Sequence, residues 1–217
     1  MPFLPSPSGC WALLLLLSTA GLAGEAFAQT NLRNAFPGRR VGGGTRGECT
    51  ARLLAHLVPS SSVYAPGATT TLGVLEGATS KPRPLLIEFR PLRSNGTAEG
   101  AQAARVKRTV PAGPLGVTLV TVPALKQSTV WETSYDCEPP AAAGATDPLA
   151  FVTSAAPPAV SLLLTEVTPA DKPVQEGLGK LRASCGGDVA RADVAKTFGL
   201  DDVVTAEWPA RIPVRCP

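Results

Sequence analysis

His56 is the only histidine in the chain and the side chain best suited to act as a general base at neutral pH. It lies in the apolar run from Leu53 to Val58, which is typical of a strand. We predict a structural residue that faces the solvent side of this strand or a polar edge of the core. The Gly-x-Ser-x-Gly pattern of hydrolase nucleophiles does not occur in the sequence, so nothing supports serine catalysis.

Two pairs of carboxylates lie close together in the sequence and are candidates for acid and base work. Asp201 and Asp202 are adjacent, so on a strand their side chains splay apart. Glu132 and Asp136 share one formal face of a strand that ends at Cys137. Solvated surface charge explains both pairs. We therefore predict that the protein is not an enzyme, with an envelope hydrolase that uses carboxylates as the alternative.

Two glycine patterns have the spacing of phosphate-binding loops. Gly42-x-Gly44-x-x-Gly47 has the dinucleotide spacing, but it follows a polar, basic stretch rather than a buried strand. Residues 38–45 have the length of a P-loop, but Gly44 stands where the phosphate-binding lysine belongs. We predict no nucleotide or other cofactor. The cysteines are too far apart in sequence to form a zinc site with one histidine, so we predict no metal.

Five arginines fall within residues 33–52, where Glu48 is the only acidic residue. Arg39, Arg40 and Arg46 are the candidate site for an anionic polymer, because a cationic arm attracts polyanions. The alternative is a solvated arm that lies along the domain and pairs with surface carboxylates. A second cationic cluster falls on two strands that we expect to pair, where intervening anions must offset the repulsion: Arg90, Arg93, Arg105, Lys107 and Arg108.

The start of the chain has the pattern of an export signal. Trp11 to Ala23 is apolar, and Ala26-Phe27-Ala28 offers small residues for cleavage. The apolar stretch is short for a membrane span, so we predict cleavage and no stable span afterwards, with an uncleaved anchor as the alternative. The net charge of the 217-residue chain is only +3, which argues against a nucleic-acid partner.

Four cysteines remain after residue 28, an even number that is typical of exported disulfide proteins. Three connectivities are open. We favour Cys49 with Cys137, which brackets the strand-rich region, and Cys185 with Cys216, which brackets the C-terminal tail. The predicted location is periplasmic or secreted.

Short apolar or alternating runs separated by Pro and Gly turns predict about eight strands. They are residues 52–58, 69–75, 85–92, 104–110, 116–122, 128–137, 149–153 and 161–168. Runs 85–92 and 104–110 are expected to form a hairpin. The spacing predicts a mostly β fold, an immunoglobulin-like or jelly-roll-like β-sandwich, with a small C-terminal helical segment. Helical spacing of apolar residues marks 173–183 and 188–198.

These patterns divide the chain into four parts. We predict a signal peptide at 1–28, an extended Gly/Arg-rich arm at 29–48, a β-sandwich domain at 49–168, and a C-terminal helical segment and tail at 169–217.

The stretch from Pro37 to Gly47, followed by Leu57-Val58-Pro59, resembles the opening of the domain of unknown function 928 family, an exported, mainly cyanobacterial family. Looser matches follow at residues 125–131, at Tyr135-Asp136-Cys137 and at Asp147-Pro148. The resemblance, to a divergent member, implies an exported β-rich domain without an established activity. We therefore expect a non-enzymatic binding or structural component of the cell envelope, whose partner is an envelope protein or an anionic polysaccharide.

Overall fold

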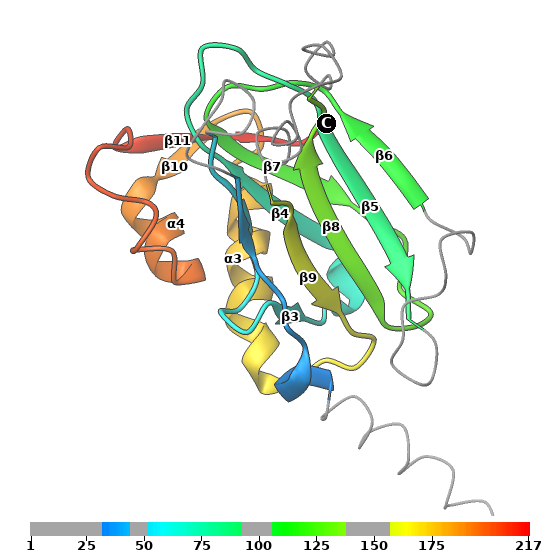
Figure 1. Cartoon of the computed structure of the whole chain (residues 1–217). Helices are drawn as coiled ribbons and strands as arrows, with labels where there is room; N and C mark the ends of the chain where they lie inside the picture. Colours follow the sequence, from blue (N-terminus) through cyan, green and yellow to red (C-terminus); the bar gives the residue numbers. More distant parts are fainter. Residues whose placement is uncertain (1–31, 44–51, 93–105, 138–156) are drawn as a thin grey trace, which may run out of the picture. The chain divides into compact units, whose positions relative to one another are not determined.

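The computed structural model describes residues 32–43, 52–92, 106–137 and 157–217 (Figure 1). The chain divides into two units, residues 1–35 and 36–217. In the first unit, residues 32–35 are helical. All the strands and helices described below belong to the second unit. The predicted signal peptide and the predicted strand at 149–153 lie outside the described residues.

The described strands form two mixed sheets, and among the described residues 36% are strand against 21% helix. The six-stranded sheet has the order β1-β2-β4-β7-β11-β10, with these bounds: β1 Val41–Gly42, β2 Leu54–His56, β4 Thr71–Glu76, β7 Gly116–Thr121, β11 Arg211–Arg215 and β10 Asp188–Ala190. The five-stranded sheet has the order β3-β9-β8-β5-β6, with these bounds: β3 Val63–Tyr64, β9 Ala159–Leu163, β8 Thr129–Tyr135, β5 Leu85–Pro91 and β6 Val106–Val110. The predicted mostly β sandwich is confirmed.

Two helices follow β9 in the chain, and short 3-10 turns lie at Gly67–Thr69 and Pro169–Asp171. Helix α3 spans Lys172–Ala183, and α4 spans Arg191–Phe198 and ends at Gly199, whose φ of 57° suits a left-handed cap. The side chain of Asp171 accepts bonds from the backbone and hydroxyl of Thr168 and from the backbone of Ala65. These bonds fix the start of α3 beside β3.

The helices and the two sheets make three layers. His56 of β2 stacks on Trp131 of β8, so this face of the six-stranded sheet meets the five-stranded sheet. Val74 of β4 lies opposite His56 and shares its face of the sheet. Gly73, the residue before Val74, points to the opposite face. A Cβ on Gly73 would lie 2.8 Å from the side chain of Leu178 in α3, so this helix covers the opposite face. All six residues of β4 are buried because both of its faces are covered.

The predicted hairpin is confirmed: β5 and β6 pair antiparallel, with Leu85 opposite Val110 and Phe89 opposite Val106. The predicted alternation along β5 is also confirmed, because Leu85, Ile87 and Phe89 are buried while Leu86 is exposed. A half-buried pattern of this kind requires that one face of the sheet meets the core and the other meets solvent.

Two expectations about local structure were wrong. Residues 188–190 form β10 rather than the start of a helix, because they pair with β11. The strand predicted at 161–168 lies at Ala159–Leu163, where it pairs with β8 and β3. The tail, for which no strand was predicted, forms β11 and pairs in parallel with β7.

The arm also carries more regular structure than expected. Arg39 pairs with Val160 of the five-stranded sheet, and two residues later Val41 pairs with Ala55 of the six-stranded sheet. The described part of the arm therefore crosses from one sheet to the other.

The predicted disulfide between Cys185 and Cys216 is confirmed, and it ties the residues after α3 to the end of β11. Cys137 is disulfide-bonded as well. Its predicted partner Cys49 lies outside the described residues, so this pairing stays a prediction. Among the helices that the structure describes, none has the length and apolar character needed to cross a membrane.

Candidate functional site

A line of charged side chains crosses the outer face of the five-stranded sheet. Glu132 of β8 lies opposite Val160 of β9, Glu88 of β5 opposite Glu132, and Lys107 of β6 opposite Glu88. Arg39 extends the line as the partner of Val160. Residues directly opposite each other share a face of the sheet. We call the charged residues of this line, together with the neighbouring Arg90, the outer charged row. Its five members are Arg39, Glu132, Glu88, Arg90 and Lys107. It carries a cation at each end.

Arg90 holds the centre of this row together. Glu88 and Glu132 face each other, and two like charges in that arrangement repel. The guanidinium of Arg90 pairs with Glu132, and its Nε lies 3.9 Å from Glu88 Oε1, while Lys107 Nζ lies 4.0 Å from Glu88 Oε2. The expectation that anions separate the second cationic cluster is therefore confirmed for Arg90 and Lys107. Arg93 and Arg105 lie outside the described residues.

The ends of the row are more exposed than its centre. The side chain of Lys107 is 72% exposed, against 21% for Glu88 and 29% for Glu132. Arg39 is exposed, and its guanidinium makes one long bond, 3.4 Å, to the carbonyl of Pro158. These two cations are therefore accessible to a ligand.

Arg40, the second predicted anion-binding residue, has a structural role instead. Its guanidinium donates to the carbonyl of Val58 at 3.0 Å and to the carbonyls of Phe198 and Gly199. Burial lowers the pKa of Arg40 from its ordinary value, and the charge of Asp202 partly opposes this. Arg40 thus ties the arm to the C-terminal end of α4. Arg46, the third predicted residue, lies outside the described part of the chain.

Arg52, which the sequence groups with the arm's cations, is buried. Its guanidinium lies 4.8 Å from the centre of the Tyr135 ring and 3.2 Å from the carboxylate of Glu76. It also donates to three backbone carbonyls: Gly77 at 2.7 Å, Gly113 at 2.7 Å and Pro114 at 2.9 Å. Arg52, at the start of the run 52–58 that the sequence predicts as a strand, is therefore part of the interior.

Glu76 is the centre of this buried charge cluster, which consists of Arg52, Glu76, Thr118 and Arg215. Its carboxylate pairs with Arg52 and Arg215 and accepts a bond of 2.8 Å from the Thr118 hydroxyl. Burial raises the pKa of Glu76, and the charge of Arg52, the Thr118 bond and Arg215 oppose the rise. Glu76 and Arg215 were not among the candidate residues predicted from the sequence. The one available signal was a carboxylate in the otherwise apolar run of β4.

His56 is fully buried between the sheets, so the expectation that it faces solvent or a polar edge was wrong. Its ring lies 3.5 Å from the Trp131 ring at an interplanar angle of 8°. Nδ1 lies 2.8 Å from Ser161 Oγ, and Nε2 lies 2.8 Å from Thr133 Oγ1. Burial lowers the pKa of His56 well below its ordinary value. The ring is therefore neutral and bridges the two sheets.

This network resembles a base beside a hydroxyl, but it is closed to substrate. His56, Ser161 and Thr133 each have no exposed surface. Both ring nitrogens already have hydroxyl partners, which satisfies the polar atoms of a buried histidine. We conclude that the network holds the sheets together.

The predicted carboxylate pairs do not converge. Asp136 is exposed and follows β8, whereas Glu132 belongs to the outer charged row. Asp201 and Asp202 are exposed in the turn after α4. Within the described ranges, the structure holds no group of three His, Cys, Asp or Glu side chains that could bind a metal ion.

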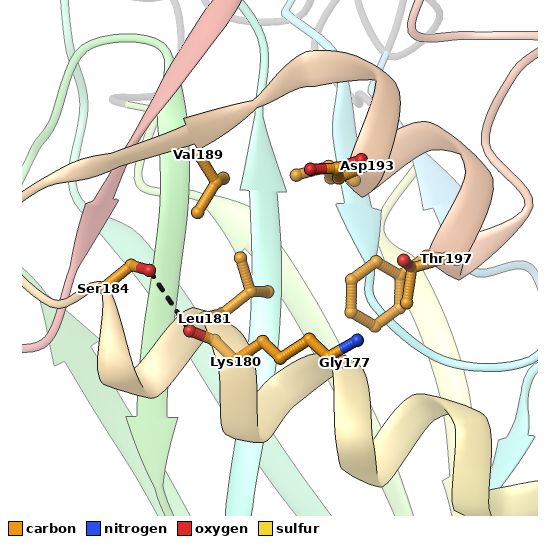
Figure 2. A pocket seen from close by; sticks show the side chains of 9 residues that line it. Gly177, Lys180, Leu181, Ser184, Val189, Asp193 and Thr197 are labelled. Carbon is orange, nitrogen blue, oxygen red and sulfur yellow. Dashed lines mark hydrogen bonds between the residues drawn. The ribbon is translucent and has the colours of Figure 1, made fainter.

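A pocket of about 390 Å³ lies between α3 and the β10–α4 segment (Figure 2). Leu181, Val194 and Phe198 form its apolar floor, and the structure buries all three side chains. Lys180 and Asp193 are exposed lining residues on the two sides. None of the residues in this pocket was a candidate at the level of sequence.

No family model matches the chain, and neither a curated protein nor a solved structure matches it. The likeness to the domain of unknown function 928 family stays a prediction.

Proposed function

We propose that this chain is an exported, non-enzymatic binding component of the cell envelope, and that it holds an anionic polysaccharide through the outer charged row. The observation that carries the proposal is the register that aligns Arg39 and Lys107 at opposite ends of one row. Of the three arm residues to which the sequence gives an anion-binding role, Arg39 is exposed, Arg40 donates to backbone carbonyls, and Arg46 lies outside the described residues. The proposal joins Arg39 to Lys107 at the β6 edge.

The spacing of the two cations favours a polymer over a small anion. Arg39 and Lys107 are separated by four strand-to-strand steps, or about 19 Å. A single small anion cannot contact both ends. A chain with repeated carboxylates can, and two simultaneous contacts strengthen binding beyond either contact alone.

The centre of the row does not repel such a chain strongly. Glu88 and Glu132 carry two negative charges, but Arg90 and Lys107 lie close to them. The five charged residues of the row together carry one net positive charge. Binding is therefore expected to be modest and sensitive to salt.

Two features support the exported location. The disulfide between Cys185 and Cys216 fits an oxidising compartment, and Cys137 is disulfide-bonded too. The apolar stretch from Trp11 to Ala23, followed by small residues, has the pattern of an export signal. We therefore propose a periplasmic or secreted location.

The test is binding of the oxidised protein to immobilised alginate, a polyuronate, at about 20 mM and about 500 mM salt. The double variant Arg39→Gln/Lys107→Gln should bind about tenfold more weakly at low salt, because two partly screened contacts are lost. The matched control Lys172→Gln/Lys196→Gln removes the same charge from exposed positions on α3 and α4 and should bind like the wild type.

Equal weakening in both double variants would show that only net charge matters and would overturn the row as the site. Absence of wild-type binding at low salt would overturn the polysaccharide proposal. Release of shortened alginate chains would favour an envelope hydrolase instead.

A further inference from the structure

The pocket between α3 and α4 is closed at one end, where the two helices touch closely. A Cβ on Gly177 would lie 2.5 Å from Thr197 Cγ2 and 3.0 Å from Phe198 Cζ, so only glycine allows this approach. From there the lining extends along the antiparallel helices to Ser184 and Val189 at the other end. The pocket volume of about 390 Å³ falls in the range of small-molecule sites.

The lining combines an apolar floor with two opposite charges. Leu181, Val194 and Phe198 supply the floor. Figure 2 shows Lys180 on the α3 side and Asp193 on the α4 side, with Leu181 between them. Both residues lie in the described part of the chain, and no ion pair within 4.0 Å joins them. Each charge therefore has room for a ligand group.

The charge pattern selects a zwitterion. A purely anionic ligand would meet Lys180 but would also meet the carboxylate of Asp193, and a cationic ligand would meet the reverse problem. A ligand with both charges and an apolar body satisfies the two walls and the floor together. Such complementarity excludes competitors through the unpaired or repelled charge that they leave.

The apolar floor decides the size. It is made of three side chains from two helices, Leu181, Val194 and Phe198, so a ligand with two apolar side chains covers more of it than a single amino acid does. One further residue adds a Cα step of about 3.8 Å between the termini. We propose that this pocket binds a short apolar peptide with free termini, a dipeptide in the simplest case. Its carboxylate pairs with Lys180, its ammonium group with Asp193, and its side chains lie on the floor.

This site is independent of the outer charged row, because none of its lining residues belongs to that row. The outer charged row is tested with a polyanion at low salt. The pocket is tested with a peptide of zero net charge at physiological salt. Failure of one proposal is therefore distinguishable from failure of the other.

The experiment uses the oxidised protein and amide NMR titration with four probes: Leu-Leu, N-acetyl-Leu-Leu, Leu-Leu amide and free leucine. Leu-Leu should shift the amides around Leu181 and Val194, and each blocked peptide should bind about fivefold more weakly because one charge contact is lost. Free leucine should also bind more weakly than Leu-Leu.

The variants assign each terminus to its wall. In Lys180→Gln, Leu-Leu and Leu-Leu amide should bind equally, because the carboxylate no longer has a partner. In Asp193→Asn, Leu-Leu and N-acetyl-Leu-Leu should bind equally for the corresponding reason. The controls Lys172→Gln and Asp201→Asn make the same substitutions at exposed positions outside the lining and should keep both differences.

Absence of shifts with about 10 mM Leu-Leu, a concentration that detects even weak binding, would overturn the proposal. Blocked peptides that bind as well as Leu-Leu would overturn the zwitterion, and equal binding of leucine would overturn the peptide. Because the wild-type comparison of blocked and free peptides needs no variant, the proposal stays testable if Asp193→Asn weakens α4.

Discussion

Lowering the pH from 7 to 5 is expected to destabilise the folded protein through His56. The ring is fully buried, both nitrogens have hydroxyl partners, and burial lowers the pKa of His56 well below its ordinary value. In the unfolded chain the ring titrates with its ordinary pKa of about 6.5. The unfolded state therefore takes up a proton that the folded state refuses.

The sign and the size follow from this difference. The stability that comes from a depressed histidine pKa is present above the unfolded pKa and is lost as the pH falls below it. If the folded ring stays neutral down to pH 5, one histidine lowers the free energy of unfolding by about 1.9 kcal/mol between pH 7 and pH 5. Because His56 is the only histidine, no other imidazole adds to this amount.

The assay is urea unfolding at both pH values for the wild type and for His56→Gln, which cannot titrate. Other groups contribute to both proteins alike and cancel in the comparison. The stability advantage of the wild type should shrink by about 1.9 kcal/mol from pH 7 to pH 5. An advantage of the same size at both pH values would refute the reasoning. The ring resonances of folded wild type provide a second measurement, since they should not titrate across this range.

Two further predictions concern packing and buried charge. Gly177→Ala should lower the free energy of unfolding by about 1–3 kcal/mol, because the new Cβ lies 2.5 Å from Thr197 Cγ2. The control is Gly179→Ala, whose new Cβ has nothing within 4 Å; it should leave the free energy of unfolding unchanged or raise it by up to about 1 kcal/mol. Equal effects in thermal unfolding would contradict the close helix contact. Arg52→Met should cost about 3–5 kcal/mol in urea unfolding, because Glu76 loses a buried partner; a loss below about 1 kcal/mol would contradict the buried charge cluster.

Local sequence patterns predicted the elements whose partners are near in sequence or whose faces differ clearly. The hairpin of β5 and β6 follows from alternation on both sides of a turn, and the strand at Leu85–Pro91 shows that alternation directly. Helix α3 follows from apolar spacing. Strand β10 could not be predicted from its own residues, because three residues of mixed polar and apolar character form a strand only by pairing with β11.

The candidate site was predictable only in part. Lys107 and Arg90 were correctly placed on strands that pair, with anions between them. Arg39 and Arg40 are adjacent and chemically alike, yet one is exposed and the other donates to the backbone beside α4. The sequence does not show which of the two arginines is exposed. The difference arises because Arg39 pairs with Val160, far away in sequence, and neighbouring side chains then point to opposite sides.

The sequence by itself determined the strand-rich class and the approximate place of the two helices, because periodicity and turn residues are properties of the local chain. It favoured the Cys185–Cys216 pairing but left three connectivities open, and the structure decided between them. Only the tertiary structure decided that His56 lies between the sheets and that Arg52 and Glu76 neutralise each other in the interior. The physical reason is that burial and pairing depend on which segments pack together, and desolvation then changes what each charged or titratable group can do.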